Sequence, residues 1–376
     1  MRLVSLSLTD WRNYPSAEFL FHPGVNLFTG ENAQGKTNLL EAVEMLSSGH
    51  AFRAIRDNEA VRFGAEFARL RGEIEQDGRI RTVEIAIPSA GKKQILTDHA
   101  ASTAAALAGK LPTVLFCPVD LNLIQSGPAD RRRLMDSALC QLRPRYSALL
   151  AEYRRVHLQK TSVLKQASER RDLLATLPDY NERIITIGAE LIRFRAAFVR
   201  LLGKYAGDVH REIGGGEELS VVYRTVSTVE DPFGDPETIR KALRAHLDAH
   251  AEAEIASASC LSGPHRDDLY LAINGREARN FASQGQCRTA AIALKLGCRQ
   301  LMENDLGVTP LLLLDDILSE LDSKRQDYVL NRIDRGQIFI TGCDTEAAAR
   351  LKSGRIFRIA GGSVAETRDF GPEEEC

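Results

Sequence analysis

Residues 30–37 read Gly30-Glu31-Asn32-Ala33-Gln34-Gly35-Lys36-Thr37. The octapeptide fits the pattern G-x-x-x-x-G-K-[ST] at every defined position. Before it, Val25 to Phe28 form a short apolar run that predicts a strand, and a helix is expected to begin just after Gly35. A strand, a glycine-bearing loop and a helix in this order are the structural context of a phosphate-binding loop.

The residue types in this loop suit a nucleoside triphosphate. Glycines let the backbone curl so that successive N–H groups point at phosphate oxygens, at the positive end of the following helix. Lys36 is expected to reach the β- and γ-phosphates, and Thr37 to ligate Mg²⁺. ATP and Mg²⁺ are therefore the predicted cofactors, with nucleotide contacts from Gly30, Glu31, Asn32, Ala33, Gln34, Gly35, Lys36 and Thr37. The loop alone leaves kinases, GTPases, helicases and ABC-type ATPases open.

Two carboxylates far along the chain form a second candidate part of the site. Leu311 to Leu314 are an apolar strand that ends in Asp315 and Asp316. P-loop enzymes place a metal-orienting acid at the end of such a strand, so Asp315 is the predicted Mg²⁺ partner. Asp316 is predicted to lie nearer the γ-phosphate and to orient or deprotonate the attacking water. The alternative, acidic residues that only cap the next helix, stays open.

A third candidate element, Ala282-Ser283-Gln284-Gly285-Gln286, opens a predicted helix before the acidic strand. Small residues and a glycine at a helix start form an anion site. Ser283, Gly285 and Gln286 are therefore candidate nucleotide contacts. A simple helix cap is the alternative interpretation.

The order of these elements resembles that of the ABC ATPases. Residues 282–286 match the signature sequence of that family, and Ser319-Glu320-Leu321-Asp322 match its D-loop. Thr341-Gly342 fall where the family has a switch histidine, but no histidine is present here. Asp316 stands where a glutamate is usual. The resemblance implies Lys36 and Asp316 as catalytic residues, and the shorter carboxylate is consistent with slow hydrolysis.

Further segments, in the same order along the chain, resemble the RecF family. These are Arg12-Asn13-Tyr14, Phe116-Cys117-Pro118, Gly127-Pro128, Arg131 to Asp136 and Ser262-Gly263-Pro264-His265-Arg266-Asp267-Asp268-Leu269. The resemblance implies a weak DNA-dependent ATPase that forms an ATP-dependent homodimer on DNA and recognises duplex next to a single-stranded gap. It implies RecR and RecO as partners in loading recombinase, and it adds Arg12 to the nucleotide-binding residues.

The expected fold is α/β. We expect an ABC-type P-loop ATPase head (lobe I) from residues 1–128 and 260–376, with residues 129–259 inserted as a mostly helical second lobe (lobe II). Apolar residues recur at helical spacing from about 129 to 205, and Leu177-Pro178 predicts a break between two long helices. Further predicted strands lie near 66–74, 80–87, 94–97, 114–117, 219–224, 268–273 and 338–340, and further helices near 235–258, 285–304 and 323–334.

The composition is that of a globular protein without a membrane span. Of 376 residues, 44% are hydrophobic and 27% are charged, and no stretch approaches the roughly 20 apolar residues of a span. The N-terminus lacks a signal-peptide pattern, so the cytoplasm is the expected compartment. The seven cysteines include no C-x-x-C pair, which predicts reduced, mostly buried thiols.

The net charge of −2 does not by itself indicate a nucleic-acid partner, so charge has to be read locally. Basic residues concentrate at Arg131, Arg132, Arg133, Arg143, Arg145, Arg154, Arg155, Lys160, Lys165, Arg193 and Arg195. They form either a DNA phosphate contact or a solvated helix face. His265 to Asp268 have a surface salt-bridged turn as their alternative interpretation. A small-molecule P-loop kinase, a transport-like or condensin-like ATPase, and a DNA-binding module that holds ATP without turnover are the competing functions.

Overall fold

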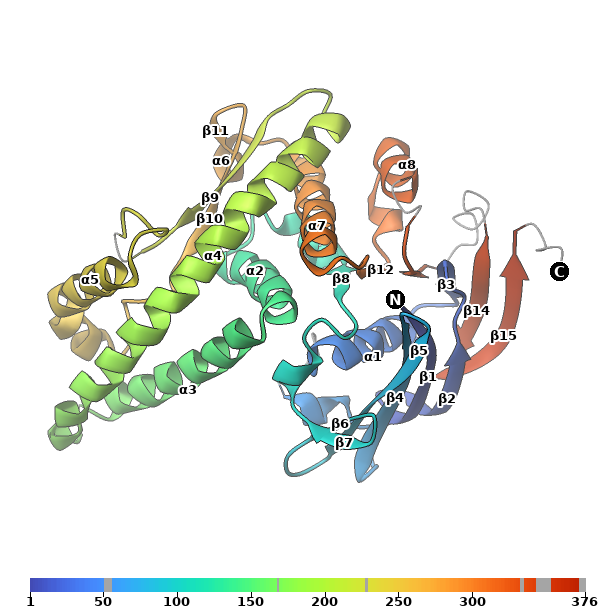
Figure 1. The fold of residues 1–376 in the computed structure, drawn as a ribbon, viewed down its shortest axis with the longest axis horizontal. Helices are drawn as coiled ribbons and strands as arrows, with labels where there is room; N and C mark the ends of the chain where they lie inside the picture. Colours follow the sequence, from blue (N-terminus) through green and yellow to red (C-terminus); the bar gives the residue numbers. More distant parts are fainter. Residues whose placement is uncertain (51–55, 168, 227–228, 332–334, 343–352, 372–376) are drawn as a thin grey trace. The chain divides into compact units, whose positions relative to one another are not determined.

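The structure is a computed structural model that describes residues 1–50, 56–167, 169–226, 229–331, 335–342 and 353–371 (Figure 1). By contacts the chain forms two compact units, 1–122 with 298–376 and 123–297. The two lobes predicted from the sequence have their boundaries at 128/129 and 259/260 instead. The division of the chain into these lobes stays a prediction.

A six-stranded sheet in the first unit carries the phosphate-binding loop. Its strands, in spatial order, are β15 (Ser363–Phe370), β14 (Gly354–Ala360), β3 (Val25–Thr29), β13 (Ile338–Thr341), β12 (Leu311–Asp315) and β8 (Thr113–Phe116). All neighbours are parallel except β15, which pairs antiparallel with β14. Every residue of β3 and β12 is buried, as expected for strands covered on both faces.

A second sheet in this unit is antiparallel. Its strands, in spatial order, are β2 (Tyr14–Leu20), β1 (Arg2–Trp11), β4 (Phe67–Gln76), β5 (Arg79–Pro88), β6 (Gln94–Thr97) and β7 (Ala100–Ser102). Burial alternates along β4, so one face of the sheet is covered and the other is exposed.

Helix α1 (Lys36–Ser48) packs against both sheets of the first unit. Its apolar residues are buried around the whole circumference, and Gly72 of β4 leaves room for the Leu46 side chain. Phe19, Phe28 and Phe357 join the sheets beside the helix, with ring centroids 5.2 Å apart for the stacked pair Phe28 and Phe357. The residues that follow the phosphate-binding loop are therefore fixed on every side.

The second unit is mainly helical. Its helices are α2 (Pro128–Leu142), α3 (Pro144–Gln166), α4 (Leu177–Ile213), α5 (Pro236–Ser257) and α6 (Ala278–Phe281), followed by α7 (Gln284–Leu306), which continues into the first unit. A small sheet has the order β11 (Arg276–Glu277), β10 (Asp268–Ile273) and β9 (Leu219–Arg224). Helix α4 packs against α3, α5 and β9. The remaining elements among the described residues are α8 (Ser323–Asn331) and the 3₁₀ turns η1 (Asp57–Ala60), η2 (Ala104–Leu107), η3 (Pro118–Asn122), η4 (Arg171–Thr176) and η5 (Leu318–Glu320).

The predicted strands and helices are present among the described residues, and residues 332–334, the end of the helix predicted near 323–334, lie outside them. Two details needed correction. The helical region contains a further break at Arg143, so α2, α3 and α4 replace the two predicted long helices. Arg143 has φ −138° and ψ 98° because Pro144 disfavours helical geometry in the residue before it. The hairpin of β14 and β15 was not predicted from the sequence.

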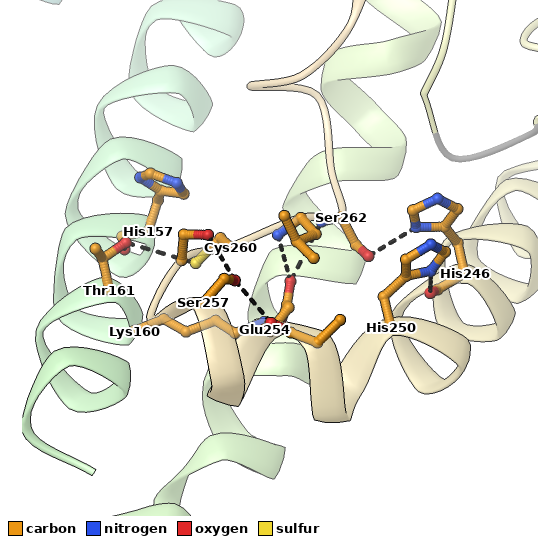
Figure 2. Close-up of polar contacts among 12 residues, drawn as sticks. His157, Lys160, Thr161, His246, His250, Glu254, Ser257, Cys260 and Ser262 are labelled. Atoms are coloured by element: carbon orange, nitrogen blue, oxygen red, sulfur yellow. Dashed lines mark hydrogen bonds and ion pairs between the residues drawn. The ribbon is translucent and has the colours of Figure 1, made fainter. Parts of the chain in front are cut away.

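A buried ion pair joins α3 to α5 in the second unit (Figure 2). Lys160 and Glu254 have side chains that are 1% and 3% exposed, and the ammonium group donates to Oε2 of the carboxylate. The other oxygen of Glu254 accepts hydrogen bonds from the N–H groups of Leu261 (2.6 Å) and Ser262 (3.2 Å). Glu254 therefore connects α3 to the segment that follows α5.

Within the segment 265–268, Asp267 is 0% exposed, so the interpretation as a surface turn was wrong for this residue, whereas Arg266 is exposed. His265 is held between two groups: its Nδ1 lies 2.7 Å from the Tyr153 hydroxyl and its Nε2 lies 3.1 Å from the Cys260 carbonyl. The carbonyl can only accept, so Nε2 donates and Nδ1 is left to accept from the Tyr153 hydroxyl. Burial, and the nearby His157 ring, lower the pKa of His265 to about 3.

Lys160→Met is expected to lower the free energy of unfolding by about 3–5 kcal/mol, because it leaves the Glu254 carboxylate buried without its cation. Urea denaturation measures this change. Lys165→Met is the matched control, since Lys165 is exposed on the same helix. Equal stability of the two variants would contradict a structural role for the pair.

His265 makes the second unit sensitive to acid. Its folded-state pKa lies below the unfolded value of about 6.5, so between pH 6.5 and 3 only the unfolded chain binds the proton. The contribution of His265 is complete above pH 6.5 and falls by up to about 1.4 kcal/mol for each pH unit below it. His265→Gln should therefore reduce the loss of unfolding free energy between pH 6.5 and 5, measured by denaturant titration at each pH. His99→Gln, which replaces an exposed histidine, is the comparison variant.

Candidate nucleotide-binding site

The loop 30–37 curls between β3 and α1 as the motif predicts. Gly30, Ala33 and Gly35 have φ values of 143°, 63° and 118°, which are the left-handed conformations that glycine adopts without strain. Gly35 is the N-cap of α1, without a side-chain capping bond. Because Gly35 has no side chain to cap the helix, the start of α1 keeps the positive end of the helix dipole, which favours an anion.

Lys36 is turned back across this loop. Its Nζ donates to the carbonyl oxygens of Gly30 (2.7 Å) and Glu31 (2.9 Å), and the residue is 4% exposed. A cation held in this position lies on the concave side of the loop, where it can neutralise phosphate oxygens.

Thr37 and Asp315 are 278 residues apart in the sequence and lie in contact. The Thr37 hydroxyl donates to Oδ1 of Asp315 over 2.8 Å. The two residues come from α1 and from the end of β12, as the sequence pattern predicted. A hydroxyl and a carboxylate on converging elements are the oxygen ligands that suit Mg²⁺, so these residues fit the expected ion.

Asp316 is held by Thr341, a residue whose role was not predicted. The Thr341 hydroxyl donates to Oδ1 of Asp315 (2.9 Å) and accepts from the N–H of Asp316 (2.9 Å). Asp316 itself has φ 50°, an unusual value for a residue other than glycine and one found at functional sites. The sequence signal for Thr341 was its position, because ABC ATPases have the switch histidine there.

The capping alternative for the two carboxylates has little structural basis. Helix α8 begins at Ser323, and Asp322 caps it by accepting from the N–H of Arg325 over 3.0 Å. Asp322 belongs to the segment that matches the D-loop. The predicted functions of Asp315 and Asp316 stay proposals.

Arg12 lies against α1. Its guanidinium donates to both carboxylate oxygens of Glu41 (2.9 and 2.8 Å) and to the carbonyl of Glu59 (2.9 Å). Glu41 is fully buried, so the pair anchors the turn between β1 and β2 on the helix. Nucleotide binding by Arg12 stays a prediction.

Ser283 and Gln286 lie in the second unit at the start of α7. They form a reciprocal capping box: the Gln286 N–H donates to the Ser283 hydroxyl (3.2 Å), and the Ser283 N–H donates to the Gln286 amide oxygen (2.9 Å). The Gln286 amide nitrogen also donates to Glu217 over 2.6 Å. Ser283 is exposed, and its hydroxyl proton is not used by the cap. Ser283 can therefore cap α7 and also contact a partner's phosphate. Gly285, which lies between Ser283 and Gln286 in the sequence, adds no side chain there.

Two arginines of the basic region are buried, so the solvated-face interpretation was wrong for them. Arg131 donates to both oxygens of Asp268 (2.7 and 2.8 Å), and Arg195 donates to both oxygens of Asp136 (2.9 and 3.1 Å). Lys160 is buried as well. Arg133 remains exposed, although it pairs with Asp130.

The remaining predictions concern thiols, metals and membranes. Cys117, Cys260, Cys287 and Cys298 are free and buried, Cys140 is free and partly exposed, and Cys343 and Cys376 lie outside the described residues. In the part of the chain that the structure describes, no cluster of three or more His, Cys, Asp or Glu side chains could hold a metal ion. Nor does any helix within those residues have the length and apolarity to cross a bilayer.

The sequence is similar to proteins of known family. A family profile described as an AAA domain matches residues 5–107. The chain is 36% identical to the DNA replication and repair protein RecF of Bacillus subtilis (strain 168), over 97% of this chain and 100% of that protein. It is 37% identical to the protein of the same name from Synechococcus sp. (strain JA-2-3B'a(2-13)), over 97% of each.

Solved structures give the same result. The recombination mediator protein RecF-ATPrS in the RecFOR pathway superimposes with a TM-score of 0.89 at 32% identity, covering 96% of this chain and 97% of that one. RecF-ATP in the same pathway gives 0.86 at 31% identity, with 98% and 97% covered. An Smc head domain from Pyrococcus furiosus, at 16% identity, gives 0.55 with 98% and 96% covered, which shows a shared fold. The chain has an ATPase head of the ABC and Smc type, and it belongs to the RecF family of DNA replication and repair proteins.

Proposed function

We propose that this chain is an ATP-dependent DNA-binding recombination mediator that dimerises on ATP and DNA. The observation that carries the proposal is the contact of Thr37 with Asp315, which joins the phosphate-binding loop to the carboxylate end of β12. The relatives named RecF, two of them solved as RecF-ATP and RecF-ATPrS, support the same nucleotide. The proposal includes recognition of duplex next to a single-stranded gap and cooperation with RecO and RecR in loading recombinase.

Each side chain has a distinct task in this proposal. The N–H groups of residues 30–37 hold the phosphates, and Lys36 neutralises the charge that develops on the transferring phosphoryl group. Thr37 and Asp315 would hold Mg²⁺, which supplies further charge neutralisation when bound. Asp316 orients or deprotonates the attacking water. Thr341 links the Asp315 carboxylate to the backbone N–H of Asp316 through one hydroxyl.

Slow turnover suits a protein that holds DNA while ATP is bound. Asp316 is shorter than the glutamate usual at this position in ABC ATPases, and Thr341 cannot supply the proton of a switch histidine. We therefore propose a weak DNA-dependent ATPase, in which hydrolysis to ADP and phosphate resets the dimer. A phosphate-binding loop in one protomer and Ser283, Gly285 and Gln286 of the other would complete each site. The cytoplasm is the proposed compartment.

Lys36→Ala should lower DNA-dependent ATP turnover by about two orders of magnitude or more, because one electrostatic stabiliser of the transferring phosphoryl group is lost. A phosphate-release assay with gapped DNA measures the rate. Lys92→Ala removes an exposed lysine of the same unit and should leave turnover unchanged. Turnover near the wild-type rate in Lys36→Ala would contradict the proposed site.

The composite site predicts rescue between two inactive variants. Lys36→Ala breaks both sites of its homodimer, and Ser283→Arg places a bulky cation where the partner's γ-phosphate docks. In a mixed dimer, one site collects both defects and the other is intact. With random pairing about half of the dimers are mixed, so independent sites would restore up to about a quarter of normal turnover.

The control separates partner contact from helix capping. Ser283→Asp retains an N-cap acceptor but adds a negative charge, so it should stabilise α7 and still abolish turnover. Turnover is measured for each homodimer and for the mixture, with dimerisation checked by mass in solution. A Ser283→Arg or Ser283→Asp homodimer that hydrolyses ATP normally would show that Ser283 is only a cap.

A further inference from the structure

The outward-facing groups of the phosphate-binding loop have specific partners. A loop that binds phosphates through N–H groups must direct carbonyl oxygens away from the ligand, and each needs a donor. The carbonyl of Gln34 accepts from Nδ2 of Asn13 (2.9 Å) and from the N–H of Gly362 (3.1 Å). The side-chain oxygen of Gln34 accepts from the N–H of Gly361 over 2.6 Å. The carbonyl of Gly35 accepts from the Tyr14 hydroxyl over 3.0 Å.

These donors come from two tight turns of the first unit. Asn13 and Tyr14 lie where β1 turns into β2, and Gly361 and Gly362 join β14 to β15. Figure 1 shows β14 beside β3, the strand that leads into the loop. We name these four residues the outer clamp.

The two turns pack closely against the phosphate-binding loop. A Cβ atom added to Gly30 would lie 2.3 Å from the carbonyl oxygen of Ile359, and one added to Gly35 would lie 2.8 Å from Oδ1 of Asn13. The two turns also touch each other, because a Cβ atom on Gly362 would lie 1.9 Å from the carbonyl oxygen of Asn13. All of these distances are shorter than real Cβ contacts. The outer side of the loop is therefore packed against the Ile359 backbone at Gly30 and against the Asn13 side chain at Gly35.

The structure also anchors the clamp to α1. Nδ2 of Asn38 donates to Oδ1 of Asn13 over 2.9 Å, and Nε1 of Trp11 donates to the Asn38 carbonyl over 2.8 Å. The turn that holds Gln34 is thus tied to the first turn of the helix that follows the loop.

We propose that the outer clamp positions the ATP site: Asn13, Gly361 and Gly362 hold Gln34 so that the N–H groups of the loop stay turned toward the phosphates. These residues do not touch the nucleotide and act through the loop. The inference rests on the proposed function, because it assigns the same loop to ATP.

Two glycines with nearly the same backbone conformation give a matched experiment. Gly78, in the turn between β4 and β5, and Gly362 have φ values of 73° and 71°, so alanine strains the backbone similarly at both. A Cβ atom on Gly78 would have no neighbour within 4 Å, whereas one on Gly362 meets Asn13. Gly362→Ala should displace the turn and weaken ATP binding by roughly tenfold, because the bonds to Gln34 are lost. Gly78→Ala should stay within about twofold of the unchanged chain.

The measurement is titration of the full chain with a fluorescent ATP analogue, together with KM and turnover at saturating ATP. A positioning role predicts that KM rises with the dissociation constant while turnover at saturation stays at the level of Gly78→Ala. Equal ATP affinity of the two glycine variants would overturn the inference, as would a fall in saturated turnover without a change in KM.

A second variant tests the same inference if Gly362→Ala does not fold. Asn13→Ala removes the donor to Gln34 from the other side of the clamp, and it should also weaken ATP binding by roughly tenfold. Unchanged affinity in Asn13→Ala would overturn the inference. Lys36→Ala separates the two proposals: normal turnover there refutes the nucleotide site itself, whereas lost turnover with normal affinity in Gly362→Ala refutes only the clamp.

Discussion

The orientation of a few peptide groups constrains the first unit. Residues 30–35 can bind phosphate only if their N–H groups face inward, and this leaves their carbonyl groups on the outside in need of donors. Lys36 donates to the carbonyl groups of Gly30 and Glu31, and Asn13, Tyr14 and Gly362 donate to those of Gln34 and Gly35. The parallel sheet, the central α1 and the β14–β15 hairpin are all arranged around that requirement.

The parts of this site that follow local rules could be predicted from the sequence. The loop, the helix at Lys36 and the strand before Asp315 depend on short patterns with known geometry. Parallel strands bring their carboxyl ends to one edge, so the approach of Asp315 to Thr37 follows from the same patterns. The β14–β15 hairpin was missed although Gly361-Gly362 is a turn signal between two short runs, because Arg, Glu and Thr residues break the apolar alternation of β15.

Long-range pairing of charges could not be predicted. A run of arginines in the sequence indicates a solvated face, because charged side chains are rarely buried alone. Here Arg131, Lys160 and Arg195 find carboxylates 137, 94 and 59 residues away. Burying such a pair costs desolvation free energy, so the pair adds little net stability. If one partner is removed, the other remains as an unpaired charge in an apolar interior. They therefore restrict which packing of the helices the chain can adopt.

Thr341 gives the site a property that a histidine would not. A hydroxyl has one proton, and in Thr341 that proton points to Asp315 while the oxygen accepts from the N–H of Asp316. The direction of both hydrogen bonds is therefore fixed: the backbone of Asp316 donates to Thr341, and Thr341 donates to the carboxylate of Asp315. Because a threonine does not ionise, this link keeps the same polarity across the whole neutral pH range. A movement of the Asp315 carboxylate can therefore act on the backbone N–H of Asp316 through rotation of the Thr341 hydroxyl, a mechanical relay in place of an acid–base one.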